Sequence, residues 1–164
     1  MRAEVTFLGL LGCLTVMGCS SAVQTQPREI TADSRQAVEK EVKATIHDFM
    51  AGFSAAKCTD VSAVSKFVRD GMIYVTNSDV FTIPLSDYEQ GLRDRVCSWV
   101  SHTGVVDSVT VDALSRDVAV AAWRFHDEVK LNSGEMRRYK GSTLMTLVRS
   151  EDGWKITSTM SAEE

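Results

Sequence analysis

The sequence contains three histidines, His47, His102 and His126. Histidine is the side chain that most readily exchanges a proton near neutral pH, and it is a common metal ligand. A zinc site needs several histidine, cysteine or carboxylate ligands at short, regular spacings. None of the three histidines has a partner at such a spacing. We therefore expect neither a metal ion nor a cofactor.

His126 is the first candidate for acid–base chemistry, because Asp127 and Glu128 follow it in an expected strand. A carboxylate beside an imidazole orients the ring and supports its action as a general base. The competing interpretation is a polar residue on the outer side of the strand, and we favour that one.

The second candidate is Asp48, which lies beside His47 in the middle of an expected helix. Its neighbours Ile46 and Phe49 belong to the buried stripe of that helix, so His47 and Asp48 should face water or the edge of the stripe. Asp48 and His126 would carry the chemistry if the protein were an enzyme. We assign no catalytic residue from the sequence.

The elements that must position these groups begin with a long helix from Asp33 to about Ala56. Its apolar side chains recur at three- and four-residue steps, at Val38, Val42, Ile46, Phe49 and Phe53. Thr59-Asp60 should cap a short second helix that ends at Asp70-Gly71. A third helix should begin at Ser86, which has Glu89 at capping-box spacing, and run to Gly104. Its apolar face would hold Leu92, Val96, Trp99 and Val100.

Six strands are expected. A short pair, Met72–Thr76 and Val80–Ile83, lies between the second and third helices. After residue 104 the apolar periodicity changes to two and predicts four more strands at Val105–Leu114, Val118–Leu131, Arg137–Arg149 and Trp154–Met160. Helices gathered toward one end of the chain and strands toward the other indicate an α+β fold.

The beginning of the chain carries a targeting signal. Val5–Gly18 is apolar but short for a membrane span. Its end, Val16–Cys19, resembles the lipobox of bacterial lipoproteins, and Leu10–Cys13 matches the same pattern. We favour Cys19 as the cysteine that receives palmitate or a similar acyl chain, because this choice uses the whole apolar run and leaves a polar tether.

The domain boundaries follow as a signal peptide over residues 1–18, a tether over 19–32 and a globular domain over 33–164. A plain signal peptide or an uncleaved anchor remains open. With an acylated Cys19, the protein would be held at a membrane of the bacterial cell envelope, facing the periplasm or the exterior.

Two cysteines, Cys58 and Cys97, remain for the folded domain. An exported protein meets oxidising conditions, in which paired thiols are often bridged. A disulfide and two buried free thiols both fit the sequence.

The chain has 164 residues and a net charge of −4, without a sustained run of Lys or Arg. A nucleic-acid-binding protein would normally present a basic face. The charge therefore argues against nucleic acid as a partner.

Three stretches resemble the nuclear transport factor 2-like superfamily, in particular its SnoaL-like group. They are FMAGFSAAKCTDVSAVSKFVRDGMIYVTN, SRDVAVAAWRF and YKGSTLMTLVRSEDGWKITS. The resemblance implies a cone in which three N-terminal helices pack on a curved, mainly antiparallel sheet around an apolar pocket. Such a family includes isomerases, dehydratases, cyclases, binding proteins and dimerising modules, so the fold does not settle the function.

Many members of that superfamily carry a histidine on the final strand, where this chain has Ser158, Thr159 and Met160. This departure weakens the case for an enzyme. The resemblance also implies a homodimer formed through the outer face of the sheet. The candidate pocket residues are Tyr74, Trp99, Trp123, Tyr139 and Met160.

The favoured interpretation is a membrane-tethered lipoprotein whose cone binds a small apolar ligand or an envelope protein. An isomerase- or dehydratase-like enzyme acting on a lipophilic substrate is the alternative, and a structural dimerisation module is the third hypothesis.

Overall fold

The computed structural model describes residues 30–76 and 78–163. Within these ranges the chain forms three helices, α1 (Ala32–Ala55), α2 (Ser62–Ser65) and α3 (Leu85–Cys97). The six strands are β1 (Val68–Val75), β2 (Val80–Ile83), β3 (Trp99–Ala113), β4 (Val118–Leu131), β5 (Met136–Ser150) and β6 (Gly153–Glu163). The expected signal peptide with Cys13, and most of the tether, including Cys19, lie outside the described residues. No helix of the described ranges has the length and apolar character needed to cross a bilayer.

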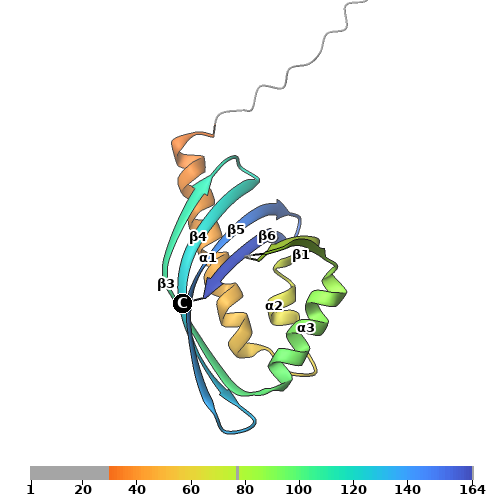
Figure 1. Ribbon diagram of the computed structural model, residues 1–164. Coiled ribbons are helices and arrows are strands. Elements are labelled where there is room, and N and C mark those ends of the chain that lie inside the picture. The colour runs from red at the N-terminus through yellow and green to blue at the C-terminus, as the bar shows by residue number, and fades with distance from the viewer. Residues whose placement is uncertain (1–29, 77, 164) are drawn as a thin grey trace, which may run out of the picture.

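The six strands form one curved sheet in the order β2-β1-β6-β5-β4-β3. All neighbouring strands are antiparallel except β1 and β6, which are parallel. Figure 1 shows the sheet curving around the helices, with α1 inside the curve and α3 beside α2 at the end near β1. The predicted α+β fold with a curved, mainly antiparallel sheet is confirmed.

Helix α1 is fixed by its apolar stripe. Val38, Val42, Ile46 and Phe49 are buried, as their spacing predicted. Burying one such side chain stabilises a fold by about 1.5–3 kcal/mol. Thr31 caps the helix, because its side chain accepts a hydrogen bond from the Ser34 backbone N–H.

A polar contact joins α1 to the end of β5 and the beginning of β6, where these two strands are connected. The Glu41 carboxylate accepts hydrogen bonds from the Trp154 indole at 3.0 Å and from the Arg149 guanidinium at 2.6 Å. The guanidinium also lies 4.6 Å from the centre of the Trp154 ring. The indole bond, followed by the guanidinium bond, holds the pKa of Glu41 below its ordinary value of 4.5.

The predicted end of the third helix is wrong. Helix α3 ends at Cys97 instead of Gly104, and Trp99 begins strand β3 opposite Leu131. Val96, Trp99 and Val100 have helical spacing, but Asn132 takes the chain out of the helix. Its backbone N–H donates to Ser98 O and its side chain donates to Cys97 O.

Two predictions about the ends of short elements are also wrong. No Ser86–Glu89 capping box forms, because the N-cap of α3 is Pro84 and Glu89 instead accepts a hydrogen bond from Ser65. Strand β1 begins at Val68 rather than at residue 72. Gly71, with a φ of 71°, lies within its register shift, so the expected helix breaker is part of a strand.

Strand β3 contains a bulge that changes whether even- or odd-numbered positions face inward. Its pairing with β4 shifts between Val106 and Ser108, which leaves Asp107 as the extra residue. From Ser101 to Val106, even-numbered positions such as Val106 share a face with Phe125, and after the bulge odd-numbered positions such as Val109 share a face with Trp123. A second register shift, between Trp99 and Ser101, lets Trp99 line the cavity as well. Strict alternation over the whole strand would place the first part of β3 with the wrong face inward.

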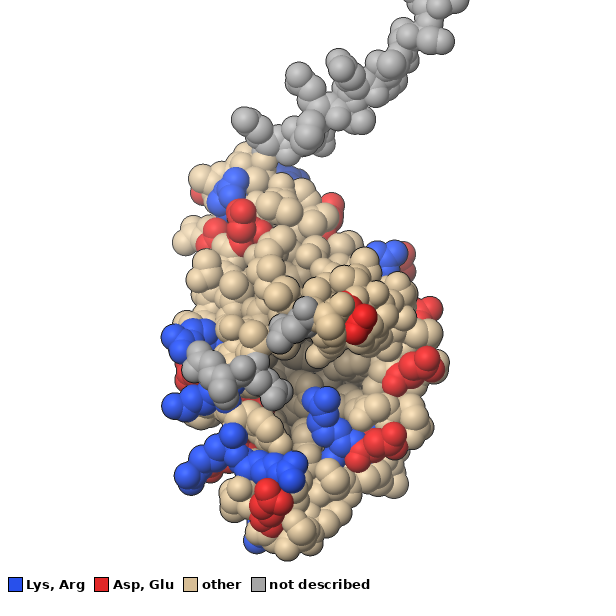
Figure 2. Space-filling view, in the orientation of Figure 1, with Lys and Arg blue, Asp and Glu red and all other residues tan. Residues whose placement is uncertain are grey.

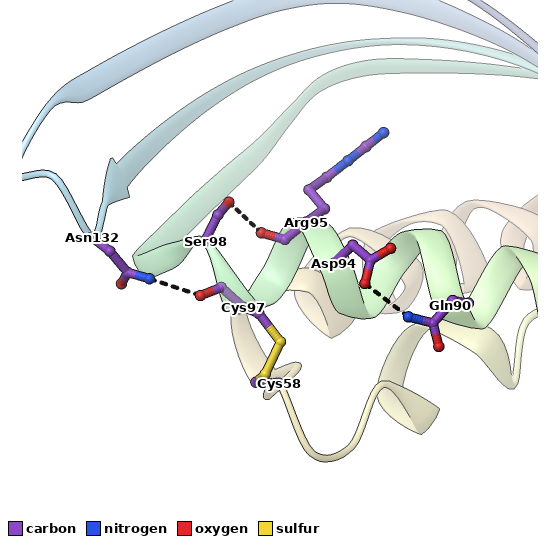
Figure 3. Close-up of a disulfide and its surroundings, with 7 residues drawn as sticks. All are labelled: Cys58, Gln90, Asp94, Arg95, Cys97, Ser98 and Asn132. Atoms are coloured by element: carbon purple, nitrogen blue, oxygen red, sulfur yellow. Dashed lines mark hydrogen bonds between the residues drawn. A yellow bond between two sulfur atoms is a disulfide. The ribbon is translucent and has the colours of Figure 1, made fainter.

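Cys58 and Cys97 form a disulfide with their Cα atoms 4.6 Å apart. It joins the segment after α1 to the last residue of α3, 39 positions later in the chain (Figure 3). Loop-closure arguments give such a bridge a stabilising effect of about 3–4 kcal/mol. The bridge also fixes the segment in which α3 gives way to β3.

Candidate functional site

A cavity of about 680 Å³ lies on the concave side of the sheet, with α1 and α3 contributing to its walls. Aromatic side chains line much of it, including Phe49 and Phe53 from α1 and Tyr74 from β1. Figure 2 shows the hollow near the centre of the molecule. Its size and apolar walls are typical of a site for a small molecule.

A histidine and a carboxylate meet on the wall of this cavity. His102 comes from β3 and Asp127 from β4, and their Nε2 and Oδ2 atoms lie 3.5 Å apart. The two side chains are only 4 % and 17 % exposed. This pair is the only contact between an acid and a histidine among the cavity-lining residues that the structure describes.

His102 is held on every side. Its Nδ1 atom lies 3.3 Å from the Ser54 hydroxyl of α1. Its ring stacks on Trp99 with the ring centres 4.9 Å apart, and Phe53 contacts it at 5.8 Å. Both ring nitrogens therefore face a polar partner, so the imidazole is fixed in orientation.

Asp127 is less completely satisfied than His102. Its Oδ1 atom is buried and has no hydrogen-bond partner among the described residues. An unpaired buried carboxylate oxygen is costly, and an atom of this kind in a cavity is a ready proton acceptor. The arrangement suits a base whose position is set by the neighbouring imidazole.

Gly104 allows the pair to approach. It lies opposite Asp127 in the β3–β4 register. A Cβ atom at this position would lie 2.9 Å from both Asp127 Oδ1 and His102 Cε1, and 2.5 Å from Met50 Sδ. Only glycine leaves room for the two side chains at this point.

Two more polar atoms in the cavity lining have no partner among the described residues. They are the indole Nε1 of Trp123 and the hydroxyl of Thr159. Between their strands, the hydroxyls of Thr143 and Ser161 lie 3.1 Å apart and satisfy each other. The cavity therefore offers an indole donor and a free hydroxyl to whatever fills it.

The cavity also carries cationic and phenolic groups. Arg95 of α3 and Arg137 of β5 belong to its lining. A hydrogen bond with Glu135, and then one with Tyr139, raises the pKa of Arg137 above its ordinary value. Burial raises the pKa of Tyr88, against a smaller opposing effect of Arg95, so this phenol stays neutral at ordinary pH.

The structure places four of the five predicted pocket residues around the cavity. Tyr74, Trp99, Trp123 and Tyr139 line it. Trp99 does so from β3 rather than from a helix. Met160 is a correction: it lies on the outer face of the sheet, 42 % exposed, because the inward-facing residues of this part of β6 are its neighbours Thr159 and Ser161.

Neither acid–base candidate of the sequence lies in the cavity lining. Asp48 is exposed on α1, as the favoured interpretation expected. His126 pairs with Asp107 at 2.8 Å, and both side chains are 45 % exposed. Its neighbour Asp127 faces the cavity instead, because successive side chains of a strand point to opposite faces.

His102 was missed as a site residue because the third helix was expected to continue to Gly104. The available signal was the run Ser101-His102-Thr103, whose polar and β-branched residues suit a strand better than the end of a helix. The partner Asp127 could not be paired with it without the strand register.

Comparisons with known proteins agree on the fold. A nuclear transport factor 2-like superfamily protein from Salmonella enterica serovar Typhimurium has 14% identity and a TM-score of 0.64, covering 77% of this chain and 91% of its own. The hexachlorocyclohexane dehydrochlorinase LinA-type3 from Novosphingobium barchaimii has 10% identity and a TM-score of 0.63, covering 82% and 91%. The association domain of CaMKII from C. elegans has 12% identity and a TM-score of 0.61, covering 79% and 98%.

No protein-family model matches the chain, and no curated protein matches its sequence significantly. The chain therefore has the nuclear transport factor 2-like fold, which its structural neighbours use in at least one enzyme and one association domain. At these identities the similarity establishes the fold alone.

Proposed function

We propose that the cavity binds a small, mostly apolar molecule and that Asp127 removes a proton from one of its carbon atoms. The observation that carries this proposal is the buried Asp127 carboxylate, which has one oxygen unpaired and His102 beside the other. Aromatic walls would hold the body of the substrate, and the free Trp123 N–H would bind an acceptor on it.

The reaction class is elimination or isomerisation. Asp127 takes the proton from carbon, and the electron pair of the broken C–H bond either forms a double bond as a leaving group departs or is protonated again at another atom. His102 stabilises the carboxylate and keeps it in position, while the apolar walls exclude water. A neighbour with this fold is named as a dehydrochlorinase, and its reaction class is consistent with this assignment.

The test uses 5-nitrobenzisoxazole, an apolar probe that opens to a coloured phenolate when a base removes its carbon-bound proton. The expected result is that Asp127→Asn lowers the protein-catalysed rate by about a hundredfold, the usual contribution of a positioned base. Glu128→Gln is the matched control, since Glu128 follows Asp127 on β4 and pairs with Arg138 outside the cavity.

Equal rates for wild type, Asp127→Asn and Glu128→Gln would contradict the catalytic role. Retained binding of apolar probes in that case would support the interpretation as a binding protein. The Asp127→Asn protein should keep its near-UV circular dichroism, which reports an intact aromatic cavity.

We further propose that the domain is tethered to a membrane of the bacterial cell envelope through an acylated Cys19. The support is the sequence Val16–Cys19 with the apolar run before it. In bacterial cells the wild type should fractionate with membranes and take up labelled palmitate. A Cys19→Ala variant should do neither, whereas Cys13→Ala should behave as the wild type.

The three stretches that resemble the nuclear transport factor 2-like superfamily in sequence also support placing the chain in its SnoaL-like group. We further propose a homodimer formed through the outer face of the sheet. That face exposes the cross-strand pair Leu144 and Met160, which are 49 % and 42 % exposed. Exposed apolar side chains grouped on a sheet face are typical of an interface.

A further inference from the structure

Arg95 is a cation on the cavity wall that has no acidic partner among the described residues. It lies in the last turn of α3, lines the cavity, and forms no salt bridge with residues 30–76 or 78–163. Figure 3 shows its side chain extending away from the disulfide. Arg93 on the same helix instead pairs with Glu89 at 3.8 Å, outside the cavity lining.

A second cation reaches the cavity from the sheet. Arg137 of β5 lines it, but its guanidinium is already held by Glu135 through contacts of 2.9 and 3.3 Å. Figure 2 shows Lys and Arg side chains on both sides of the hollow. Arg95 therefore supplies the charge that remains free for a ligand, and Arg137 adds to the positive field.

The strand register relates Arg137 to the proposed base. Asp127 lies opposite Tyr139, and Arg137 lies opposite Val129 on the same pair of strands. Arg137 and Asp127 are thus diagonal neighbours, at a Cα separation of roughly 7–8 Å. A small molecule spans such a distance.

The acid that α3 contributes to the cavity lining, Asp87, lies far from Arg95. Asp87 is eight positions earlier on the helix, roughly 12 Å away along its axis. It does not neutralise Arg95, so the C-terminal end of α3 presents net positive charge to the cavity.

We propose that the cavity selects substrates carrying one carboxylate, which the Arg95 guanidinium binds, with the acidic carbon next to that carboxylate facing Asp127. This proposal rests on the proposed function for the role of Asp127 and extends it to the class of substrate. A guanidinium matches the planar carboxylate with two parallel hydrogen bonds. One free cation fits a single negative charge better than a phosphate dianion.

The chemistry gives the guanidinium a second role. When Asp127 takes the proton, the electron pair of the C–H bond moves onto the carboxylate, whose second negative charge lies against Arg95. The electron pair then moves back toward carbon, where it either forms a double bond as a leaving group departs from the next carbon or takes up a proton. A fixed cation at the site of developing charge stabilises this transition state.

The test compares two matched ligands, 1-naphthylacetate and its neutral analogue 1-naphthylacetamide, by calorimetric titration of the wild type. The carboxylate should bind about tenfold more tightly than the amide, which corresponds to about 1.4 kcal/mol. Arg95→Gln should abolish this preference while leaving the affinity for the amide within about twofold. Arg93→Gln, with the same change in charge on the same helix, should keep the preference.

Equal affinities of wild type for the two ligands, or no binding of the carboxylate, would overturn the proposal. So would an Arg95→Gln protein that keeps the preference or loses both ligands equally. The ligand titration tests Arg95 separately from the rate measurement that tests Asp127. A preference for the carboxylate ligand, together with an unchanged 5-nitrobenzisoxazole rate in Asp127→Asn, would support the anion site and refute the catalytic role.

Discussion

Two histidine–aspartate pairs join β3 to β4, and their surroundings give them different roles. His126 and Asp107 are both 45 % exposed, so solvent reaches the polar atoms that they leave unpaired. His102 and Asp127 are 4 % and 17 % exposed among aromatic rings, and one carboxylate oxygen has no partner among the described residues. The same two residue types are thus a solvated surface pair on one face and a buried pair at the cavity on the other.

Glu41 gives a prediction of pH dependence at the scale of single residues. Its pKa is lowered in the folded protein, chiefly by the Trp154 bond and then by Arg149. A lowered folded pKa stabilises the fold fully above the unfolded value, and this contribution is lost as the pH falls through the folded value. Glu41→Gln should therefore lower the free energy of unfolding at pH 7 by roughly 0.5–1 kcal/mol, discounted for the exposure of this carboxylate.

Urea unfolding of the two proteins at a series of pH values measures this effect. The difference should be complete above pH 4.5 and shrink below it. Glu39→Gln is the control, since Glu39 forms no ion pair with the described residues. A difference that stays constant down to pH 2 would show that Glu41 acts through packing rather than charge.

At this scale the sequence located the aromatic lining but not the buried pair of His102 and Asp127. Tyr74, Trp123 and Tyr139 follow from strand periodicity, because large aromatic residues on an alternating strand face the interior. Asp127 and His102 come from different strands, so their meeting depends on a register that periodicity does not encode.

Among the secondary-structure elements, the α3–β3 boundary and the β3 bulge decide what lines the cavity. The disulfide at Cys97 and the two bonds from Asn132 end the helix just before Trp99. These are contacts between segments far apart in the sequence. Local apolar spacing therefore placed α1 correctly but carried α3 seven residues too far.

Gly104 gives a prediction for strand β3. Gly104→Ala should push Met50, His102 and Asp127 apart, because its methyl group would lie within 3.0 Å of all three side chains. Overpacking of this kind costs about 1–3 kcal/mol. The variant should also lose most of the 5-nitrobenzisoxazole activity attributed to Asp127.

Thermal and urea unfolding, together with the probe rate, check this expectation. Gly91→Ala is the stability control, since a Cβ on this helical glycine meets nothing within 4 Å. It should stabilise the protein by about 0.5–1 kcal/mol. Gly104→Ala with wild-type stability and rate would show that the pair does not need this close approach.

For the whole molecule, the curved sheet separates two environments. Its concave face is covered by α1 and encloses the cavity, whereas part of its convex face exposes Leu144 and Met160. The sequence indicated that both faces of the sheet are partly apolar, since both faces of the strand Val118–Glu128 begin with apolar residues. It placed Met160 on the wrong side. Alternation from the buried Trp154 and Ile156 would put Met160 inside as well, but the register shift at Thr157 puts Thr159 inside instead.

The proposed homodimer gives a prediction at this scale. Leu144→Glu places a charge on the apolar face and should convert a dimer into a monomer of unchanged fold, measured by light scattering after gel filtration. Val80→Glu is the control, because Val80 is also exposed but lies on β2. A monomeric wild type at high concentration would contradict the proposal.

The bulge at Asp107 has a consequence for how such a site tolerates a change in chain length. It absorbs one residue, so that His102 before it and Val109 after it both face inward although they lie an odd number of positions apart. In the gene, this corresponds to one codon. An in-frame deletion of that codon would make Val106–Phe125 and Ser108–Arg124 consecutive pairs, so β3 would alternate regularly with His102 and Val109 still facing inward. The cavity wall should therefore keep its arrangement in descendants of this protein that gain or lose one residue at this position.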